Sequence, residues 1–209
     1  MKTVIIRDND FSFAVEALLR GGLVAVPTET VYGLACNGLD AAAVGKVYEV
    51  KGRPTVKPLS LLVPDLSIAE TVCAEIPEAA RLLAEAFWPG PLTIVLPRRS
   101  TVPDIVAAGG GTVGVRCPDH PKTLEFLRLA GVPTAAPSAN VSDMPSPKSV
   151  EDVLAYFDGK IDCVIDGGRC ALGVESTIID MTVTPYRVLR QGALPEDEIR
   201  RRLGRNGVA

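Results

Sequence analysis

The sequence predicts an α/β fold, and three observations support this class. Nearly half of the 209 residues are hydrophobic (47%) but only 5% are aromatic, so the core must be built from aliphatic side chains. The 19 glycines and 17 prolines suit an architecture with many short connections better than a helical bundle. Short apolar runs also alternate with segments of helical period along the chain. We expect a single domain over residues 1–209.

The individual elements follow from apolar period and from start and stop residues. Strands are expected at 4–6, 23–26, 59–63, 92–96, 113–116, 132–140 and 161–165, with a neighbouring pair at 175–180 and 186–190. Helices are expected at 11–19, 41–51, 79–87, 122–129, 150–157 and 195–203, and another begins at Asp65. Asp40 is expected to cap the second helix, and Gly52 and Pro54 to end it.

Composition also excludes several classes of protein. The formal charge of −3 provides no overall field for nucleic acid, so any polyanion site must be local. No apolar run approaches the length of a membrane span, and acids appear too early for a signal peptide, so a cytoplasmic location is expected. Five scattered cysteines favour buried thiols over disulfides. The single histidine, His120, favours a helix start over catalysis.

The stretch from Pro27 to Lys57 organises the rest of the chain. An apolar run ends at Pro27 and opens into a hydroxyl-rich elbow over 28–37, followed by a helix and a cationic loop. α/β proteins bind anionic ligands in this way at the carboxyl end of a strand. An ordinary strand-to-helix turn is the alternative for the elbow, although its density of hydroxyls weighs against that.

The cationic loop predicts a local anion site. Between residues 46 and 57 there are four cations and one acid, Glu49. Complementing the dipole at the helix C-terminus explains Lys51, but Arg53 and Lys57 lie beyond the helix in a loop stiffened by proline. Charge and spacing also make Lys51 a candidate phosphate ligand.

Further polar groups follow later strands. Arg116 ends a buried strand and needs a partner, either a ligand carboxylate or an internal acid, and the sequence leaves both open. The segment 132–140 is expected to deliver Ser138 and Asn140 as donors, and 142–149 forms a polar loop suited to a mobile flap. The glycine run at 107–112 matches no phosphate-binding fingerprint.

These groups favour one kind of chemistry. The chain has no G-x-S-x-G, no His placed as a base, no dinucleotide fingerprint and no spaced zinc ligands. Cations and hydroxyls from five loops would stabilise phosphate and carboxylate by positioning and charge, without a covalent nucleophile. This predicts nucleotidyl transfer, with Mg²⁺ arriving on ATP and no metal site in the protein.

Eight motifs, in order over 25–192, resemble the YrdC/TsaC family. They are P-T-E-T-V-Y-G-L at 27–34, K-G-R-P at 51–54, K-P-L-S-L-L at 57–62, W-P-G-P-L-T at 88–93, G-V-R-C-P at 114–118, P-S-A-N at 137–140, E-S-T-I-I-D at 175–180 and L-R-Q-G at 189–192. The resemblance implies a twisted, open, mixed sheet flanked by helices, with a deep concave cleft. The implied activity is L-threonylcarbamoyladenylate synthesis from L-threonine, bicarbonate and ATP, with release of pyrophosphate. A downstream threonylcarbamoyl-transferase complex would then make t6A at position 37 of tRNA.

The resemblance also implies site residues. Those implied for L-threonine are Thr30, Arg116 and Ser176. Those implied for ATP are Arg53, Lys57, Thr112, Ala136, Ser138, Ser146 and Arg190, to which the residue patterns above add Lys51 and Asn140. Two features depart from longer relatives: Leu62 stands where many carry a threonine-binding histidine, and no second C-terminal domain follows, so a short single-domain form is expected.

Two other functions compete with this one. The first is a non-catalytic module that binds double-stranded RNA or tRNA in a basic concavity. The net charge of −3 argues against this function, so at most weak binding of RNA is expected. An enzyme that forms a carbamoyl adenylate, as in hydrogenase maturation, would contain a similar domain. Such chains also carry zinc-finger and acylphosphatase-like segments, which this sequence lacks.

Overall fold

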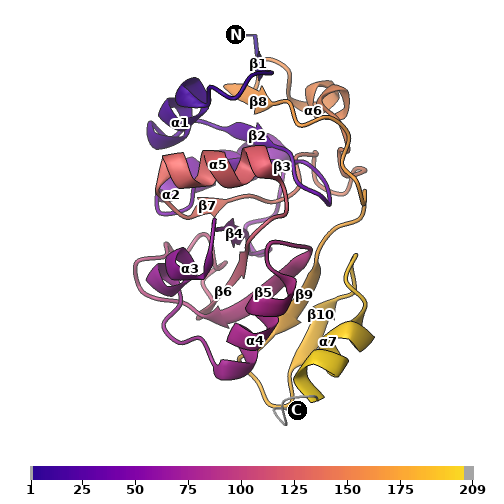
Figure 1. Ribbon diagram of the computed structural model, residues 1–209. Helices are drawn as coiled ribbons and strands as arrows, with labels where there is room; N and C mark the ends of the chain where they lie inside the picture. The colour runs from indigo at the N-terminus through magenta and orange to yellow at the C-terminus, as the bar shows by residue number, and fades with distance from the viewer. Residues whose placement is uncertain (1, 205–209) are drawn as a thin grey trace.

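Short strands of small aliphatic residues form one continuous sheet. The computed structural model describes residues 2–204, and within them ten strands pair in the order β1-β8-β2-β3-β7-β4-β6-β5-β9-β10 (Figure 1). The strands are β1 (Val4–Ile6), β2 (Val24–Val26), β3 (Gly33–Asn37), β4 (Ser60–Leu62), β5 (Leu92–Pro97), β6 (Thr112–Arg116), β7 (Thr134–Ala135), β8 (Cys163–Ile165), β9 (Thr177–Asp180) and β10 (Arg187–Arg190). The twisted, open α/β sheet that the sequence predicts is confirmed.

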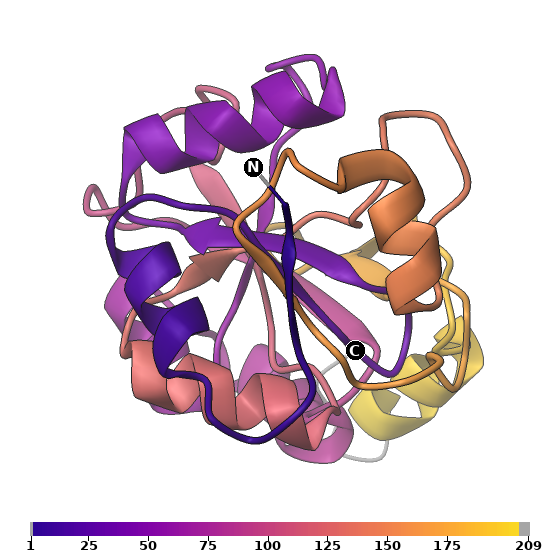
Figure 2. The same cartoon turned by 90° about the horizontal axis from the view of Figure 1, so that it is seen from above.

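Helices cover the sheet on both faces. Within the described residues they are α1 (Ser12–Leu19), α2 (Ala41–Lys51), α3 (Leu66–Val72), α4 (Glu78–Phe87), α5 (Pro121–Ala130), α6 (Val150–Phe157) and α7 (Glu196–Gly204). α1 and α5 lie together on one side of the strands, and α2 lies on the other (Figure 2). No helix in this part of the chain is long and apolar enough to cross a membrane.

The core consists of two clusters, one on each face of the sheet. Val24 and Val26 belong to the cluster that packs under α1 and α5, whereas Ala25 belongs to the cluster under α2, α4 and α6. Successive side chains of a strand point to opposite faces, which divides β2 between the two clusters. Because β2 is buried on both sides, it appears in the sequence as a continuous apolar run.

The polar elbow differs from its prediction. Residues 28–32 form a connection, but Gly33–Asn37 is a strand that returns antiparallel to β2, with Val24 opposite Ala35 and Val26 opposite Gly33. The expected strand-to-helix elbow over 28–37 is therefore wrong in its second half. Small buried residues on both faces gave no alternation to reveal this strand. The expected strand at 132–140 is also shorter, because only Thr134–Ala135 pairs within a strand.

Helix boundaries follow the sequence closely. The Asp40 side chain accepts hydrogen bonds from the backbone of Ala42 and Ala43, and Gly52 ends α2 in the left-handed conformation with φ of 58°. His120 occupies the N-cap position of α5, ahead of Pro121. The helix-start role predicted for His120 is confirmed. All five cysteines are free thiols, and four of them are buried.

Gly192 provides a test of close backbone packing. A Cβ at this position would clash with the backbone of Glu175 and Ser176, whereas a Cβ at Gly45 in α2 meets only the Ile105 side chain at 4.0 Å. We expect Gly192→Ala to destabilise the fold by about 1–3 kcal/mol, since the neighbouring backbone must shift. Gly45→Ala should instead stabilise it by about 0.5–1 kcal/mol through helix propensity. Urea unfolding measures both, and equal effects would contradict the packing at Gly192.

Candidate active site

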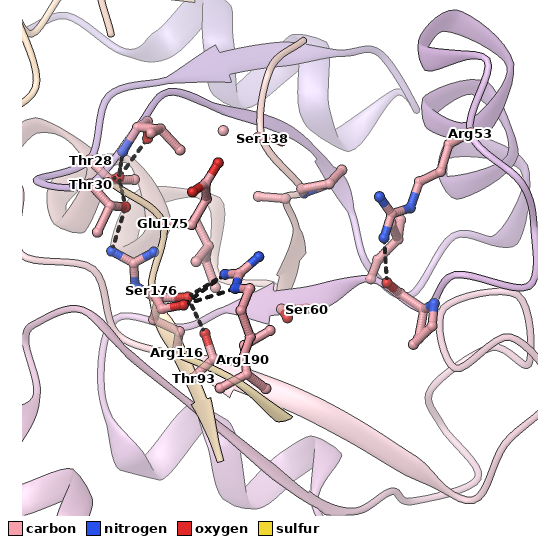
Figure 3. A pocket seen from close by; sticks show the side chains of 18 residues that line it. Thr28, Thr30, Arg53, Ser60, Thr93, Arg116, Ser138, Glu175, Ser176 and Arg190 are labelled. Carbon is pink, nitrogen blue, oxygen red and sulfur yellow. Dashed lines mark hydrogen bonds between the residues drawn. The ribbon is translucent and has the colours of Figure 1, made fainter. Parts of the chain in front are cut away.

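A cavity opens where several polar loops and strand ends meet. Its volume is about 150 Å³, and it is open to solvent on one side. Seven of the residues predicted for a site line it: Thr30, Arg53, Arg116, Ala136, Ser138, Ser176 and Arg190. They come from distant parts of the sequence, and Figure 3 shows Arg116 beside Thr30 on one side of the cavity and Arg53 on the opposite side.

Arg116 is fixed at the end of β6. The residue is 7% exposed, its Nε donates to the Gly90 carbonyl at 3.1 Å, and its Nη2 donates to Thr30 Oγ1 at 3.0 Å. The same Nη2 lies 2.8 Å from Oε1 of Glu29. The internal acid left open by the sequence is therefore present. Arg116 nevertheless lines the cavity, and no acceptor among residues 2–204 contacts its Nη1. A ligand carboxylate can still bind there.

Ser176 sits in a hydrogen-bonded group next to Arg116. Its hydroxyl shares a hydrogen bond of 2.8 Å with Thr93 Oγ1, and Nη2 of Arg190 donates to it at 3.1 Å (Figure 3). Arg190 also donates through Nε and Nη2 to the Ser176 carbonyl, at 3.1 and 2.8 Å. These bonds fix Arg190 with its charge uncompensated by any ion pair in the described residues. Burial lowers the pKa of Arg190, the carboxylate of Glu175 acts in the opposite direction, and Arg116 and Arg53 add smaller decreases.

Arg53 supplies the third cation. Its Nε donates to the Lys57 carbonyl at 3.2 Å and its Nη2 to the Pro58 carbonyl at 3.0 Å. Both acceptors lie in the same loop, which Pro54 stiffens, so the guanidinium is held by its own turn. Burial lowers the pKa of Arg53, but an arginine side chain remains charged at neutral pH.

Lys51, predicted as a phosphate ligand, lies outside the cavity lining in the structure. Lys51 is 1% exposed and does not line the cavity. Its Nζ donates to the carbonyls of Ser138 and Asn140, each at 2.5 Å, and to Asn140 Oδ1 at 3.1 Å. Burial and nearby Arg53 lower the pKa of Lys51 to about 7, while the three acceptors favour the ammonium form. Lys51 therefore shapes the loop that carries Ser138.

Four other residues predicted for the ATP site do not line the cavity. Lys57 and Thr112 are exposed, and Lys57 Nζ lies 3.5 Å from Oδ1 of Asp143. Asn140 turns inward, accepting from Lys51 Nζ and from the Ser138 hydroxyl at 2.6 Å. Ser146 donates to Oε1 of Glu175 at 2.5 Å, so the loop at 142–149 is bound to a lining residue. A ligand contact from any of these four needs a rearrangement of side chains or loop.

Several lining residues were not selected from the sequence. Thr28, Ser60, Thr93 and Glu175 all line the cavity, and each lies inside one of the quoted motifs. Their polar side chains beside or within apolar segments were the available signal, but only the sheet order shows that they face one space. Leu62 also lines the cavity, so the position noted for a histidine in longer relatives presents an apolar side chain here.

The chemistry available here is electrostatic. None of the five cysteines lines the cavity, and burial raises the pKa of the Cys117 thiol to about 11. Within residues 2–204, no three His, Cys, Asp or Glu side chains gather as a metal-ligand group. Three arginines and several hydroxyls instead surround a space with one carboxylate, that of Glu175. Such a site can bind and orient two anionic groups.

Comparison with known proteins identifies the family of this chain. Residues 16–192 match the model of the Sua5/YciO/YrdC family, which is described as telomere recombination. That match covers most of the chain. The chain belongs to this family. The resemblance drawn from the motifs is thereby confirmed.

Named members of the Sua5/YciO/YrdC family are close in sequence. The threonylcarbamoyl-AMP synthase of Pyrococcus abyssi is 50% identical over 88% of this chain and 54% of its own length. That of Bacillus subtilis is 41% identical over 94% of this chain and 57% of its own. The structure of P. abyssi Sua5 complexed with L-threonine matches with a TM-score of 0.94 at 45% identity, covering 98% of this chain and 61% of that one. The chain thus spans little more than half the length of these relatives.

The role found for Lys51 can be tested by stability. Lys51→Met removes the donor of three hydrogen bonds and leaves buried carbonyls unpaired, so we expect a loss of roughly 2–4 kcal/mol. Lys57→Met, at a side chain that is 48% exposed, should change stability by less than about 0.5 kcal/mol. Chemical denaturation measures the free energy of unfolding of both variants. Equal losses of stability would contradict the structural role of Lys51.

Proposed function

We propose that this chain synthesises threonylcarbamoyl-AMP from L-threonine, bicarbonate and ATP. The observation that carries the proposal is the meeting of Arg53, Arg116 and Arg190 in one cavity that offers hydroxyls but no nucleophile. The names of the relatives support the reaction, and the L-threonine complex of P. abyssi Sua5 supports the amino acid. The product would pass to a downstream transferase that makes t6A at position 37 of tRNA.

L-Threonine would bind at the end of β6. Its carboxylate would accept hydrogen bonds from Arg116, whose Nη1 has no protein acceptor in the described residues. Thr30 and Ser176 lie on either side with hydroxyl groups that can bond the amino acid's polar atoms. Leu62, on the strand beside β6 and in register with Arg116, would offer an apolar contact.

ATP would occupy the side of the cavity that carries Arg53 and Arg190. These two guanidinium groups are held by neutral oxygens and keep their charge for phosphates. Ser138 and the backbone of Ala136 line the same space. Ser146 and Lys57 would join only after leaving Glu175 and Asp143, their partners here. Mg²⁺ would enter with the nucleotide as part of the substrate.

The reaction then needs positioning more than acid–base strength. The threonine amine attacks bicarbonate carbon, and loss of water gives the N-carboxylate. One oxygen of this carbamate attacks the α-phosphorus of ATP, and the bond to the β-phosphate oxygen breaks to release pyrophosphate. Three anions must approach one another, so arginines that offset their repulsion contribute directly to the rate.

The same proposal extends to the molecular setting. We infer that residues 1–209 act as one catalytic domain in the cytoplasm. One sheet joins all the described strands, which supports a single domain. The decisive experiment supplies MgATP, bicarbonate and L-threonine, and follows pyrophosphate and the adenylate product. Pyrophosphate release that ignores threonine, or no release, would overturn the proposed function.

Arg116 and Arg53 should affect different substrates. Arg116→Ala removes a charge-assisted contact to the carboxylate, so KM for L-threonine should rise about 10- to 100-fold, with KM for ATP nearly unchanged. Arg53→Ala should show the reverse pattern. Steady-state kinetics with each substrate varied in turn measures both, and Arg81→Ala, at a side chain on α4 that is 38% exposed and outside the cavity lining, serves as the control. If each variant changed KM for L-threonine and KM for ATP equally, the assignment of L-threonine to the Arg116 side and of ATP to the Arg53 side would be contradicted.

A further inference from the structure

The three arginines of the cavity are held in two different ways. Arg53 and Arg190 donate only to uncharged oxygens of carbonyl and hydroxyl groups, and neither forms an ion pair within residues 2–204. Arg116 instead has a carboxylate, that of Glu29, 2.8 Å from Nη2. The cavity therefore has one side where an arginine forms an ion pair and another where, within the described residues, the arginines form none.

Glu29 stands behind the cavity wall. It does not line the cavity, and its side chain is 10% exposed, against 9% for that of Arg116. Its Oε2 accepts from the backbone of Asp119 at 3.1 Å, and its carbonyl accepts from the backbone of Leu172 at 2.8 Å. Both ends of the residue are thus fixed. Glu29 cannot swing into the cavity without breaking these bonds.

The contact between Glu29 and Arg116 is electrostatic. Oε1 of Glu29 is buried and makes no hydrogen bond to the described part of the chain, although Nη2 of Arg116 is within ion-pair distance. Nη2 donates to Thr30 Oγ1 instead. The carboxylate therefore compensates the charge of Arg116 without occupying the Nη1 edge that a ligand would use. In a buried setting this compensation is only weakly screened by solvent.

This compensation has a consequence for ligand choice. Glu29 and Arg116 together carry no net charge, so an anion that binds Arg116 also meets the negative charge of Glu29. A zwitterionic amino acid brings an ammonium group with its carboxylate and gains from Glu29 what a simple anion loses. Glu175, the carboxylate that lines the cavity, forms no ion pair with the three arginines within residues 2–204, and Ser146 binds it. The hydrogen bond from Ser146 and, less strongly, the charge of Arg190 lower the pKa of Glu175, so this carboxylate belongs to the side of Arg190.

We propose that Glu29 is a specificity-determining residue, which reserves Arg116 for an α-amino acid and keeps phosphate-type anions on the side of Arg53 and Arg190. The inference rests on the proposed function, because it assigns the two substrates to these two sides. With Glu29 in this role, pyrophosphate would bind at Arg53 and Arg190 but not at Arg116, although all three arginines line the cavity.

The test measures whether inorganic pyrophosphate competes with L-threonine. Titration calorimetry gives the Kd of L-threonine with and without saturating pyrophosphate, in the absence of ATP. For the wild-type chain we expect pyrophosphate to change this Kd less than twofold. For Glu29→Gln, which removes the charge but keeps the size, pyrophosphate should raise it at least tenfold. Glu29→Asp keeps the charge and should stay within threefold of the wild-type response.

Glu70→Gln is the matched control, because it makes the same change in an exposed ion pair with Arg81 (2.7 Å) far from the cavity lining. It should behave as the wild type does. Displacement of L-threonine by pyrophosphate from the wild-type chain would overturn the inference, and this arm does not depend on the folding of any variant. A Glu29→Gln protein insensitive to pyrophosphate would overturn it as well. If the wild-type chain bound no L-threonine, the proposed function itself would fail, which distinguishes the two results.

Discussion

The geometry of the cavity depends on one buried guanidinium. Arg116 is largely buried at the carboxyl end of a central strand, where an unpaired charge would be costly. Two separate segments provide its partners: the Gly90 carbonyl and Thr30 Oγ1 accept hydrogen bonds, and Glu29 forms an ion pair. The loop after β2 must therefore lie against the end of β6, which forms one wall of the cavity.

The strand order brings the remaining walls together. β5 pairs antiparallel with β6 and parallel with β9, so Thr93 and Ser176, which are far apart in sequence, share a hydrogen bond beside Arg116. On the other flank, Ser60 of β4 is in register with Gly114, where a Cβ would approach the Ser60 hydroxyl to 2.9 Å. Small and hydroxyl side chains at these positions keep the strands close while leaving space above them.

The sequence predicts the elements better than the directions of their side chains. α2 was accurate at both ends, because Asp40 and Gly52 act through local backbone geometry. The cation count between residues 46 and 57 was a sound reason to expect an anion site, yet it could not show that Lys51 turns away to bind the loop at 138–140. That direction depends on a segment almost ninety residues later. For Arg116 the internal acid is present, since Glu29 lies at Nη2, and the ligand carboxylate stays a prediction for Nη1, which has no acceptor within residues 2–204.

The same distinction explains the residues that sequence reasoning missed. Glu29, Thr93 and Glu175 all lie within the quoted motifs, but a polar residue in a motif has no evident role until its partner is known. A cavity lined by three arginines carries electrostatic repulsion, because Arg116 and Arg53 add to the larger effect by which burial lowers the pKa of Arg190. Compensating all three charges would abolish the attraction for anions, and compensating none would let any anion bind anywhere. One carboxylate placed behind one arginine resolves this conflict, and its position is a property of the fold rather than of any single motif.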